Sequence, residues 1–207
     1  MQQKPMIILT GPTAVGKSAL SVELAKKING AVISADSMQV YRHMDIGSAK
    51  IRPEEMCGVP HYLIDVLDPS EEFHVVKFVE LAHEAMEKIY AAGQIPIVTG
   101  GTGFYIQALL KEVDFTESHG ELPIRKQLEE KAATEEGAAE LYRELSEVDP
   151  VSAETIHPNN VKRVIRALEY YHETGQKISE HNEEQKQKES PYCSASVSYT
   201  HLTLPTK

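Results

Sequence analysis

The segment GPTAVGKS, residues 11–18, constrains this chain more than any other, because it fits the pattern G-x-x-x-x-G-K-[S/T] of a phosphate-binding loop. An unbroken apolar run, MIILT (6–10), leads into it, and a helical pattern with Leu20, Leu24 and Ile28 on one face follows it. Strand, glycine loop and helix thus occur in the order that the motif requires. A chance match on a strand–turn–helix unit is the alternative. The motif predicts bound phosphate without saying which reaction uses it.

Each part of the loop has an expected task. Gly11 and Gly16 permit backbone geometries that turn successive N–H groups toward an anion. Lys17 can neutralise terminal phosphate oxygens, and Ser18 can ligate Mg²⁺, the expected cofactor. We predict that diphosphate or nucleotide is bound by Gly11, Pro12, Thr13, Ala14, Val15, Gly16, Lys17 and Ser18.

The first half of the chain predicts an α/β fold. Further apolar runs occur in AVISAD (31–36), HYLIDVLD (61–68) and IPIVTGG (95–101), and helical patterns cover 75–93 and 104–110. Continuous rather than alternating apolarity is typical of strands buried on both faces of a parallel sheet. The alternation of strands and helices predicts a parallel sheet covered by helices.

The second half of the chain differs in composition and in hydrophobic pattern. Residues 114–190 read as a helical appendage, with a charged helical stretch over 123–147, a break at Asp149-Pro150 and an amphipathic helix over 161–172. Residues 179–188 are polar enough to predict a solvated or mobile segment. The last residues, SASVSYTHLTLPTK (194–207), predict either a short terminal strand or foreign or frame-shifted sequence.

Composition limits the functional classes. A formal net charge of −10 argues against a nonspecific nucleic-acid binder, although it leaves room for a local basic surface. The two cysteines, Cys57 and Cys193, form no C-x-x-C motif, which suits a reducing cytoplasm. No apolar run approaches a membrane span, and the first strand begins too early to leave room for a signal peptide.

Two strand ends carry candidate site residues. Asp36, in SADSMQVY, is either a general base or metal partner, or a helix N-cap. Thr99-Gly100-Gly101-Thr102-Gly103 stands where a kinase or ATPase often carries an acidic Mg²⁺ partner. Its glycines allow close approach of a substrate, or form only a tight strand–helix turn.

Two basic groups could contact nucleic-acid phosphates or be solvated surface charge. One is Lys162, Arg163 and Arg166; the other is Arg42, His43, Lys50 and Arg52. In LIDVLDP, a Walker-B-like aspartate is one interpretation of Asp65 and Asp68, and turn formation is the other, favoured for Asp68.

Together, GPTAVGKS, SADSMQVYRHMDIGSAK, PHYLIDVLDP, IPIVTGGTGFY and EVDPVSAETIHPNNVKRVIRALE closely resemble the bacterial tRNA dimethylallyltransferases, also called tRNA isopentenyltransferases. The resemblance covers about residues 5–192. It implies a P-loop NTPase-type core with a helical insertion. It also implies transfer of a dimethylallyl group from dimethylallyl diphosphate to the exocyclic amine of the adenosine 3′ to the anticodon, in tRNAs reading codons that begin with U. A cytoplasmic monomer is implied as well.

The resemblance assigns roles to residues. Lys17 and Thr13 match positions at the donor, and Asp36 matches the family's general base. The implied tRNA contacts are Asp36, Ser37, Met38, Gln39, Thr102, Arg125, Asn160, Val161, Lys162, Arg163 and Val164. The loop would then hold the donor's diphosphate, although its shape also suits ATP.

The resemblance stops near Tyr192, which predicts a C-terminally truncated chain with domains 1–113 and 114–190 and a core remnant or foreign tail at 191–207. Two rival functions stay open, and the truncation supports the second of them. One is a P-loop small-molecule or nucleotide kinase. The other is a noncatalytic tRNA-binding remnant. A plain regulatory P-loop ATPase is a third alternative.

Overall fold

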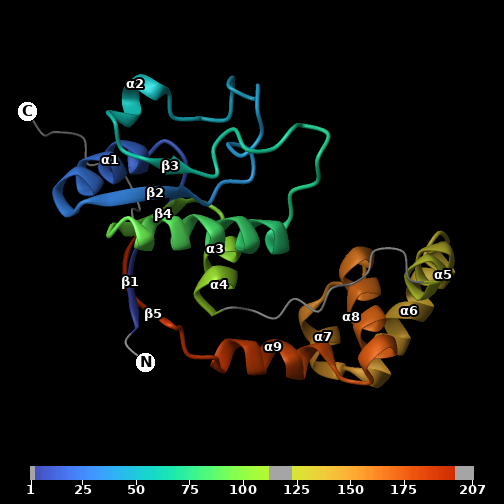
Figure 1. The fold of residues 1–207 in the computed structure, drawn as a ribbon. Helices are drawn as coiled ribbons and strands as arrows, with labels where there is room; N and C mark the ends of the chain where they lie inside the picture. The colour runs from blue at the N-terminus through green and yellow to red at the C-terminus, as the bar shows by residue number, and fades with distance from the viewer. Residues whose placement is uncertain (1–2, 112–122, 199–207) are drawn as a thin grey trace, which may run out of the picture. The chain divides into compact units, whose positions relative to one another are not determined.

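The computed structural model describes residues 3–111 and 123–198, which divide into two compact units (Figure 1). The first unit contains residues 3–111 and the returning segment 190–198, and the second contains residues 123–189. The domain boundary expected at residue 113 lies in the segment 112–122, outside the described residues.

The first unit is an α/β unit. Its elements in chain order are β1 (Lys4–Thr10), α1 (Lys17–Ile28), β2 (Gly30–Ser34), α2 (Pro53–Met56), β3 (His61–Tyr62), α3 (Val75–Ala91), β4 (Ile95–Gly100), α4 (Gly103–Lys111) and β5 (Tyr192–Ser198). The strands form one sheet in the order β3-β2-β4-β1-β5, and every neighbouring pair is parallel. The parallel α/β core predicted from the apolar runs is confirmed.

Helices cover both faces of this sheet (Figure 1). Phe78 and Ile89 of α3 and Leu109 of α4 pack on one face, in a cluster with Ile8 and Ile33. On the other face, Val22 and Ala25 of α1 are buried in a cluster with the strand residues Leu9, Val32 and Ile97. The predicted apolar face of the helix, Leu20, Leu24 and Ile28, is partly buried against the same cluster. Because successive strand residues point to opposite faces, burial of both faces explains the unbroken apolar runs.

The strand expected within 61–68 is shorter than the apolar run in the sequence indicates. β3 has two residues, and its pairing with β2 ends at Tyr62. Leu63 and Asp65 adopt left-handed conformations, with φ of 61° and 55°. Non-glycine residues with such φ values cannot continue an extended strand, so the chain turns away from the sheet.

The returning segment forms an edge strand. β5 pairs with β1 from Lys4↔Tyr192 to Thr10↔Ser198. All its residues except the half-buried Tyr192 are exposed. The terminal-strand interpretation of the tail therefore holds for the part up to Ser198, and residues 199–207 lie outside the described residues.

The second unit is helical. Its elements are α5 (Pro123–Lys131), α6 (Glu135–Val148), α7 (Pro150–Thr155), α8 (Val161–Thr174) and α9 (Ile178–Gln187). The buried cluster is built around Leu141, Leu145 and Leu168. Residues 179–188, expected to be a solvated or mobile segment, are mostly exposed to solvent, but most of the stretch is the helix α9, which that expectation did not include. Glu, Gln and Lys are good helix formers, and one buried contact near Ser179 fixes the start of the helix.

That contact is to Asp149, which links three helices of the second unit. Asp149 is 2% exposed, and its carboxylate accepts hydrogen bonds from the backbone N and Oγ of both Ser152 and Ser179, at 2.7–3.1 Å. Asp149 ends α6, caps the N-terminus of α7 and anchors the start of α9. Burial alone raises the pKa of this carboxyl, but the four hydrogen bonds outweigh burial and hold the pKa below its ordinary value.

This lowered pKa makes stability depend on pH in a defined direction. Because the folded pKa lies below the unfolded value of about 3.9, Asp149 stabilises the fold above pH 4, and this contribution is lost as the pH falls through the folded pKa. We expect Asp149→Asn to lower the free energy of unfolding by about 1–3 kcal/mol at pH 7. The deficit relative to wild type should shrink toward pH 3. Urea unfolding followed by circular dichroism at both pH values measures this, and a deficit independent of pH would contradict it.

Among the described residues, no helix has the length and apolar character needed to cross a membrane.

Candidate functional site

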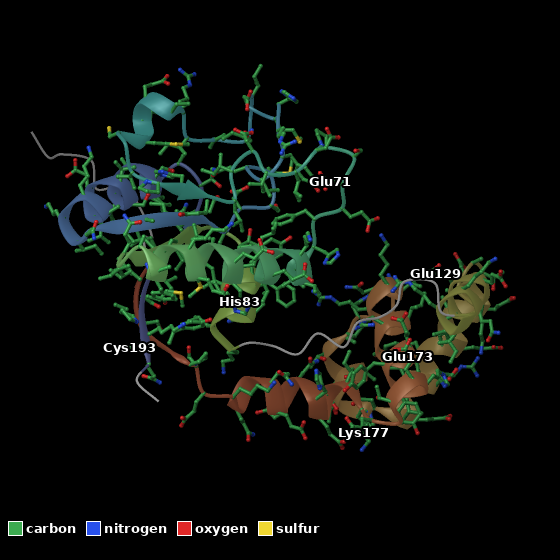
Figure 2. The ribbon with its side chains drawn as sticks, viewed as in Figure 1. Glu71, His83, Glu129, Glu173, Lys177 and Cys193 are labelled. Carbon is green, nitrogen blue, oxygen red and sulfur yellow. The ribbon has the colours of Figure 1, made fainter. Side chains whose placement is uncertain are left out.

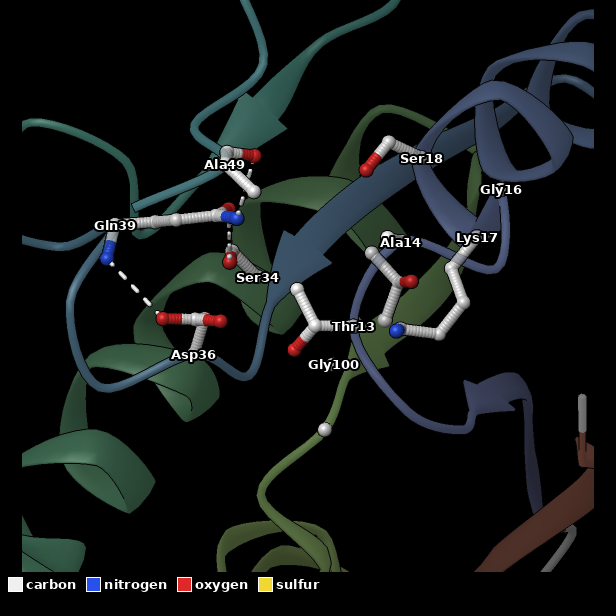
Figure 3. Close-up of a pocket in the computed structure, with 12 residues that line it drawn as sticks. Thr13, Ala14, Gly16, Lys17, Ser18, Ser34, Asp36, Gln39, Ala49 and Gly100 are labelled. Atoms are coloured by element: carbon white, nitrogen blue, oxygen red, sulfur yellow. Dashed lines mark hydrogen bonds between the residues drawn. The ribbon is translucent and has the colours of Figure 1, made fainter. Parts of the chain in front are cut away.

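The phosphate loop, β2 and β4 meet around one cavity of about 280 Å³ at the carboxyl edge of the sheet (Figure 3). Parallel strands place their ligand crevice at this edge. The lining residues are Thr13, Ala14, Gly16, Lys17, Ser18, Ser34, Asp36, Gln39, Ala49, Thr99, Gly100 and Gly101. The structure therefore brings together residues of two separately predicted motifs, Thr13, Lys17 and Ser18 of the loop and Asp36 after β2.

The loop has the backbone conformation expected of an anion cradle. Gly11, Ala14 and Gly16 have positive φ values of 147°, 66° and 91°. Gly16 is the N-cap of α1 in a left-handed conformation, and it has no side chain with which to cap the helix. The N-terminal N–H groups of α1 therefore face the cavity edge without a side-chain cap, a position that favours a negatively charged ligand. Of the predicted loop residues, Gly11, Pro12 and Val15 lie outside the cavity lining. The side chain of Val15 is buried, so this residue can contribute only through its backbone.

Lys17 is held over its own loop. Its Nζ donates a hydrogen bond of 2.6 Å to the carbonyl of Pro12. Partial burial lowers the pKa of Lys17, and the negative charge of Asp36 acts in the opposite direction. A charged ammonium in a partly desolvated cavity interacts strongly with an added anion. Lys17 is therefore placed to bind phosphate oxygens.

Asp36 combines the two roles that its sequence left open. Its Oδ1 accepts hydrogen bonds from the backbone N of Met38 at 2.8 Å and of Gln39 at 3.3 Å. This is the turn-capping arrangement. Among the described residues no hydrogen bond occupies Oδ2, and the half-buried residue lines the cavity. Capping fixes the carboxylate in place and leaves one oxygen for chemistry (Figure 3).

Gln39 shapes the cavity wall. It shares a 3.0 Å hydrogen bond with the Oγ of Ser34 through Oε1, and its Nε2 donates to the carbonyl of Ala49 at 3.1 Å. The resemblance predicts that Gln39 contacts tRNA, but the structure uses its amide to join β2 to the loop at Ala49. Sequence reasoning missed Ser34 and Ala49 as lining residues. Ser34 could have been found as the last residue of a strand leading to the site, whereas Ala49 carries no local signal.

The glycines after β4 have a steric purpose. A Cβ on Gly100 would lie 2.2 Å from the carbonyl oxygen of Ala35. The N–H of Ala35 in turn donates a 2.7 Å hydrogen bond to the carbonyl oxygen of Thr99. Here the ends of β2 and β4 approach too closely for any side chain. Gly100 is therefore required for the close approach of the two strand ends at the cavity. It does more than form the tight strand–helix turn that was one interpretation of these glycines.

We expect Gly100→Ala to destabilise the first unit by about 1–3 kcal/mol or more, because the backbone of β2 must move to admit the methyl group. In a chain of this size each kcal/mol lowers the melting temperature by about 2–4 °C. Gly103→Ala is the matched control, because a Cβ there meets nothing within 4 Å. Thermal unfolding should separate the two variants, and equal melting temperatures would contradict the steric account.

In the basic group at residues 42–52, Lys50 and Arg42 stabilise a loop. Lys50, whose side chain is 5% exposed, pairs with Asp45 at 2.7 Å and Asp65 at 2.6 Å. Burial disfavours its charge, but these two carboxylates outweigh burial and raise the pKa of Lys50. The guanidinium of Arg42 donates to the carbonyls of Asp65 and Val66. These cations therefore have a structural role that neither sequence interpretation considered.

The LIDVLDP aspartates take structural positions. Asp65 lies outside the cavity lining and pairs with Lys50, so the structure gives the Walker-B-like interpretation no support. Asp68 accepts hydrogen bonds from the N and Oγ of Ser70, in the turn favoured for it. These bonds lower its pKa.

The predicted tRNA contacts are spread over both units. In the first, Ser37 and Met38 are exposed beside Asp36, while Thr102 lies next to the cavity and its carbonyl accepts from the N–H groups of Tyr105 and Ile106 in α4. In the second, Asn160, Lys162, Arg163 and the half-buried Arg125 lie at the surface. The side chain of Val164 is buried in the helical core and that of the half-buried Val161 packs against this core, and their assignment as tRNA contacts stays a prediction.

The cavity offers oxygen ligands for a hard cation. The described residues include no group of three or more His, Cys, Asp or Glu side chains suited to hold a metal ion. The cavity does contain the hydroxyls of Thr13, Ser18 and Ser34 and the carboxylate of Asp36. Mg²⁺ is typically bound by one or two protein oxygens together with substrate phosphates. The donor set therefore fits Mg²⁺ carried with a diphosphate.

Comparisons with known proteins agree on one family. The family model described as "IPP transferase" matches residues 39–205, beyond the point near Tyr192 where the motif resemblance stops. A tRNA dimethylallyltransferase of Lachnoclostridium phytofermentans is 64% identical over 189 residues, which cover 91% of this chain and 60% of the relative. Another, from Bacillus cytotoxicus, is 50% identical over 89% of this chain and 58% of the relative. The chain thus spans about 60% of the length of these curated relatives.

Solved structures give the same picture. A full-length tRNA isopentenylpyrophosphate transferase from Bacillus halodurans is 44% identical with a TM-score of 0.62, and the match covers 96% of this chain and 60% of that one. A eukaryotic dimethylallyltransferase, solved acting on tRNA, is 39% identical with a TM-score of 0.83, and the match covers 95% of this chain and 48% of that one.

Proposed function

We propose that this chain, which belongs to the IPP transferase family, transfers a dimethylallyl group from dimethylallyl diphosphate to tRNA. The observation that carries the proposal is the single cavity in which a phosphate loop, with Lys17 and Ser18, faces the carboxylate of Asp36. The relatives' activity on tRNA agrees with it. The acceptor we propose is the exocyclic amine of the adenosine 3′ to the anticodon, in tRNAs reading codons that begin with U.

The donor end of the reaction needs charge neutralisation. Diphosphate leaves as its carbon–oxygen bond to the dimethylallyl group breaks, and negative charge develops on the leaving oxygen. The N–H groups at the start of α1 and the ammonium of Lys17 are placed at the cavity to stabilise that charge. The hydroxyl of Thr13 lies in the same lining and would orient the donor. Mg²⁺ bound through Ser18 would add further positive charge at the diphosphate.

The acceptor end needs a base. An aromatic exocyclic amine is a weak nucleophile, and it becomes reactive as its proton is removed. Asp36 is held by its Oδ1 while its Oδ2 remains available, so it can accept that proton. The adenine must leave its stack to reach the cavity, as in enzymes that flip bases. Ser37 and Met38, exposed beside Asp36, are suitably placed to contact the flipped nucleotide.

Calorimetric titration with Mg²⁺ present tests the proposal by comparing dimethylallyl diphosphate with ATP, followed by transfer of a labelled dimethylallyl group to tRNA. We expect tighter binding of the prenyl diphosphate and incorporation into tRNA. Tighter binding of ATP would instead favour a small-molecule or nucleotide kinase. Binding of tRNA without transfer would favour a noncatalytic tRNA-binding chain.

A further inference from the structure

A buried carboxylate in the helical unit binds two surface arginines. The side chain of Glu169, on α8, is 0% exposed. Its Oε2 lies 3.0 Å from Nη1 of Arg166 on the same helix and 3.4 Å from Nη1 of Arg125 on α5. Both arginine side chains are about one third exposed, at 35% and 36%. One carboxylate therefore fixes two guanidiniums that also face solvent.

Stability alone gives a poor account of this arrangement. A single arginine would neutralise Glu169, whereas a second adds a like charge next to the first. Buried Arg–Glu–Arg groups can often be replaced by apolar side chains without loss of stability. In addition, Oε1 of Glu169 has no hydrogen-bond partner within the described part of the chain, although it is buried. A buried carboxylate oxygen without a hydrogen-bond partner lowers the stability of the fold. The stability of the fold therefore does not explain this group of three charged side chains.

The surrounding charges favour an anionic partner. Lys162 and Arg163 are exposed on the first turn of α8, at i−4 and i−3 from Arg166, and so lie on the same side of the helix. The positive end of the α8 dipole lies there as well. Within the described residues, the carboxylates recorded as paired with the two arginines are Glu169 and Glu129 (labelled in Figure 2), and Oε1 of Glu129 lies 3.0 Å from Nε of Arg125. Among these described side chains, four cations, Arg125, Arg166, Lys162 and Arg163, stand against two carboxylates.

We infer that Arg166 and Arg125 form a paired-guanidinium site for the phosphate backbone of tRNA and that Glu169 is the positioning residue that holds the pair. Planar guanidiniums held in a fixed orientation suit bidentate recognition of phosphate. The inference rests on the proposed function for tRNA as the partner. It adds one contact, Arg166, to those that the motif resemblance implies, and one positioning residue, Glu169.

Glu169→Gln gives the decisive test, because charge and position predict opposite results. The substitution makes the helical unit more positive by one charge, which would strengthen binding if the site were only a diffuse positive field. If Glu169 positions the pair, the neutral amide holds the arginines less well, and binding of an unmodified tRNA transcript should weaken about fivefold. Equal or tighter binding by a folded Glu169→Gln chain would overturn the inference.

Arg166→Lys also tests whether a positioned guanidinium, rather than positive charge alone, binds tRNA, and it leaves residue Glu169 unchanged. It keeps the charge but loses the planar fork, so we expect binding about tenfold weaker, close to that of Arg166→Gln. Arg166→Gln should also reduce the slope of log affinity against log salt by about 1. The matched control is Arg143→Gln, which removes an exposed arginine from α6 of the same unit. Tenfold losses confined to the Arg166 variants support the site, and losses no larger than that of the control would overturn it.

The two proposals fail in different ways. If the wild-type chain binds no tRNA, both the proposed function and this inference fail. If wild type binds tRNA and neither Glu169→Gln nor Arg166→Lys weakens binding, only the paired site fails. Circular dichroism of each variant shows whether the helical unit is folded.

Discussion

Replacing Lys17 with alanine is expected to weaken binding of dimethylallyl diphosphate by roughly 10²–10³-fold. The ammonium of Lys17 is partly desolvated and held over the loop by its hydrogen bond to Pro12, so its charge acts on a bound diphosphate with little screening. Calorimetric titration with Mg²⁺ present measures the loss. The fold should be intact, because the hydrogen bond recorded for the Lys17 side chain is exposed and stays within its own loop.

Lys27→Ala is the matched control for that measurement. It removes the same charge from the exposed last turn of the same helix, away from the cavity lining. It should leave donor affinity within about twofold of wild type, because exposed charges beyond the Debye length, about 8–10 Å, are largely screened. Equal losses in the two variants would mean that net charge, rather than the loop, determines donor affinity.

Asp36→Asn should lower the rate of dimethylallyl transfer to tRNA by roughly 10²–10⁴-fold, the usual contribution of a general base. Asparagine retains an oxygen that can accept from the backbone N of Met38 and Gln39, so the turn should survive. Donor affinity should change only a few-fold. The rate is measured under single-turnover conditions with a labelled donor, which separates chemistry from binding.

Asp36→Ala separates the two roles of this carboxylate. It loses the base and the cap, so it should show the same rate defect and an additional loss of about 0.5–2 kcal/mol in stability. An Asp36→Asn chain that transfers the group at nearly the wild-type rate would remove Asp36 from the chemistry and leave it as a cap.

Local patterns in the sequence predict much of the first unit. The run MIILT, the loop at 11–18 and the helix ending at Ile28 appear where their apolar spacing and glycines indicate, because these signals act over a few residues. The positions of Lys17, Ser18 and Asp36 at one sheet edge follow from strand order alone. The same reasoning could not predict that Ala49 lines the cavity. Ala49 lies on a loop whose path depends on the contacts of Gln39 and Lys50.

The sequence was least informative about polar side chains with distant partners. Residues 179–188 carry the composition of a solvated segment, and only the contact between Ser179 and Asp149, 30 positions away, shows why a helix begins there. Lys50 and Arg42 look like surface cations until their partners at 65–66 are known. Glu169 belongs to an amphipathic pattern that predicts neither its complete burial nor its two arginines.

The place of β5 in the sheet has a consequence for biosynthesis. Lys4 of β1 pairs with Tyr192 of β5, so these two neighbouring strands are separated in sequence by nearly the whole described chain. As the polypeptide leaves the ribosome, β1 to β4 are available first, and the entire helical unit must be synthesised before β5 can join them. During that interval the nascent chain presents the outer edge of β1, with its unpaired N–H and C=O groups, to any other extended segment. A helical unit that folds through its own local contacts shortens the effective span that β5 must close.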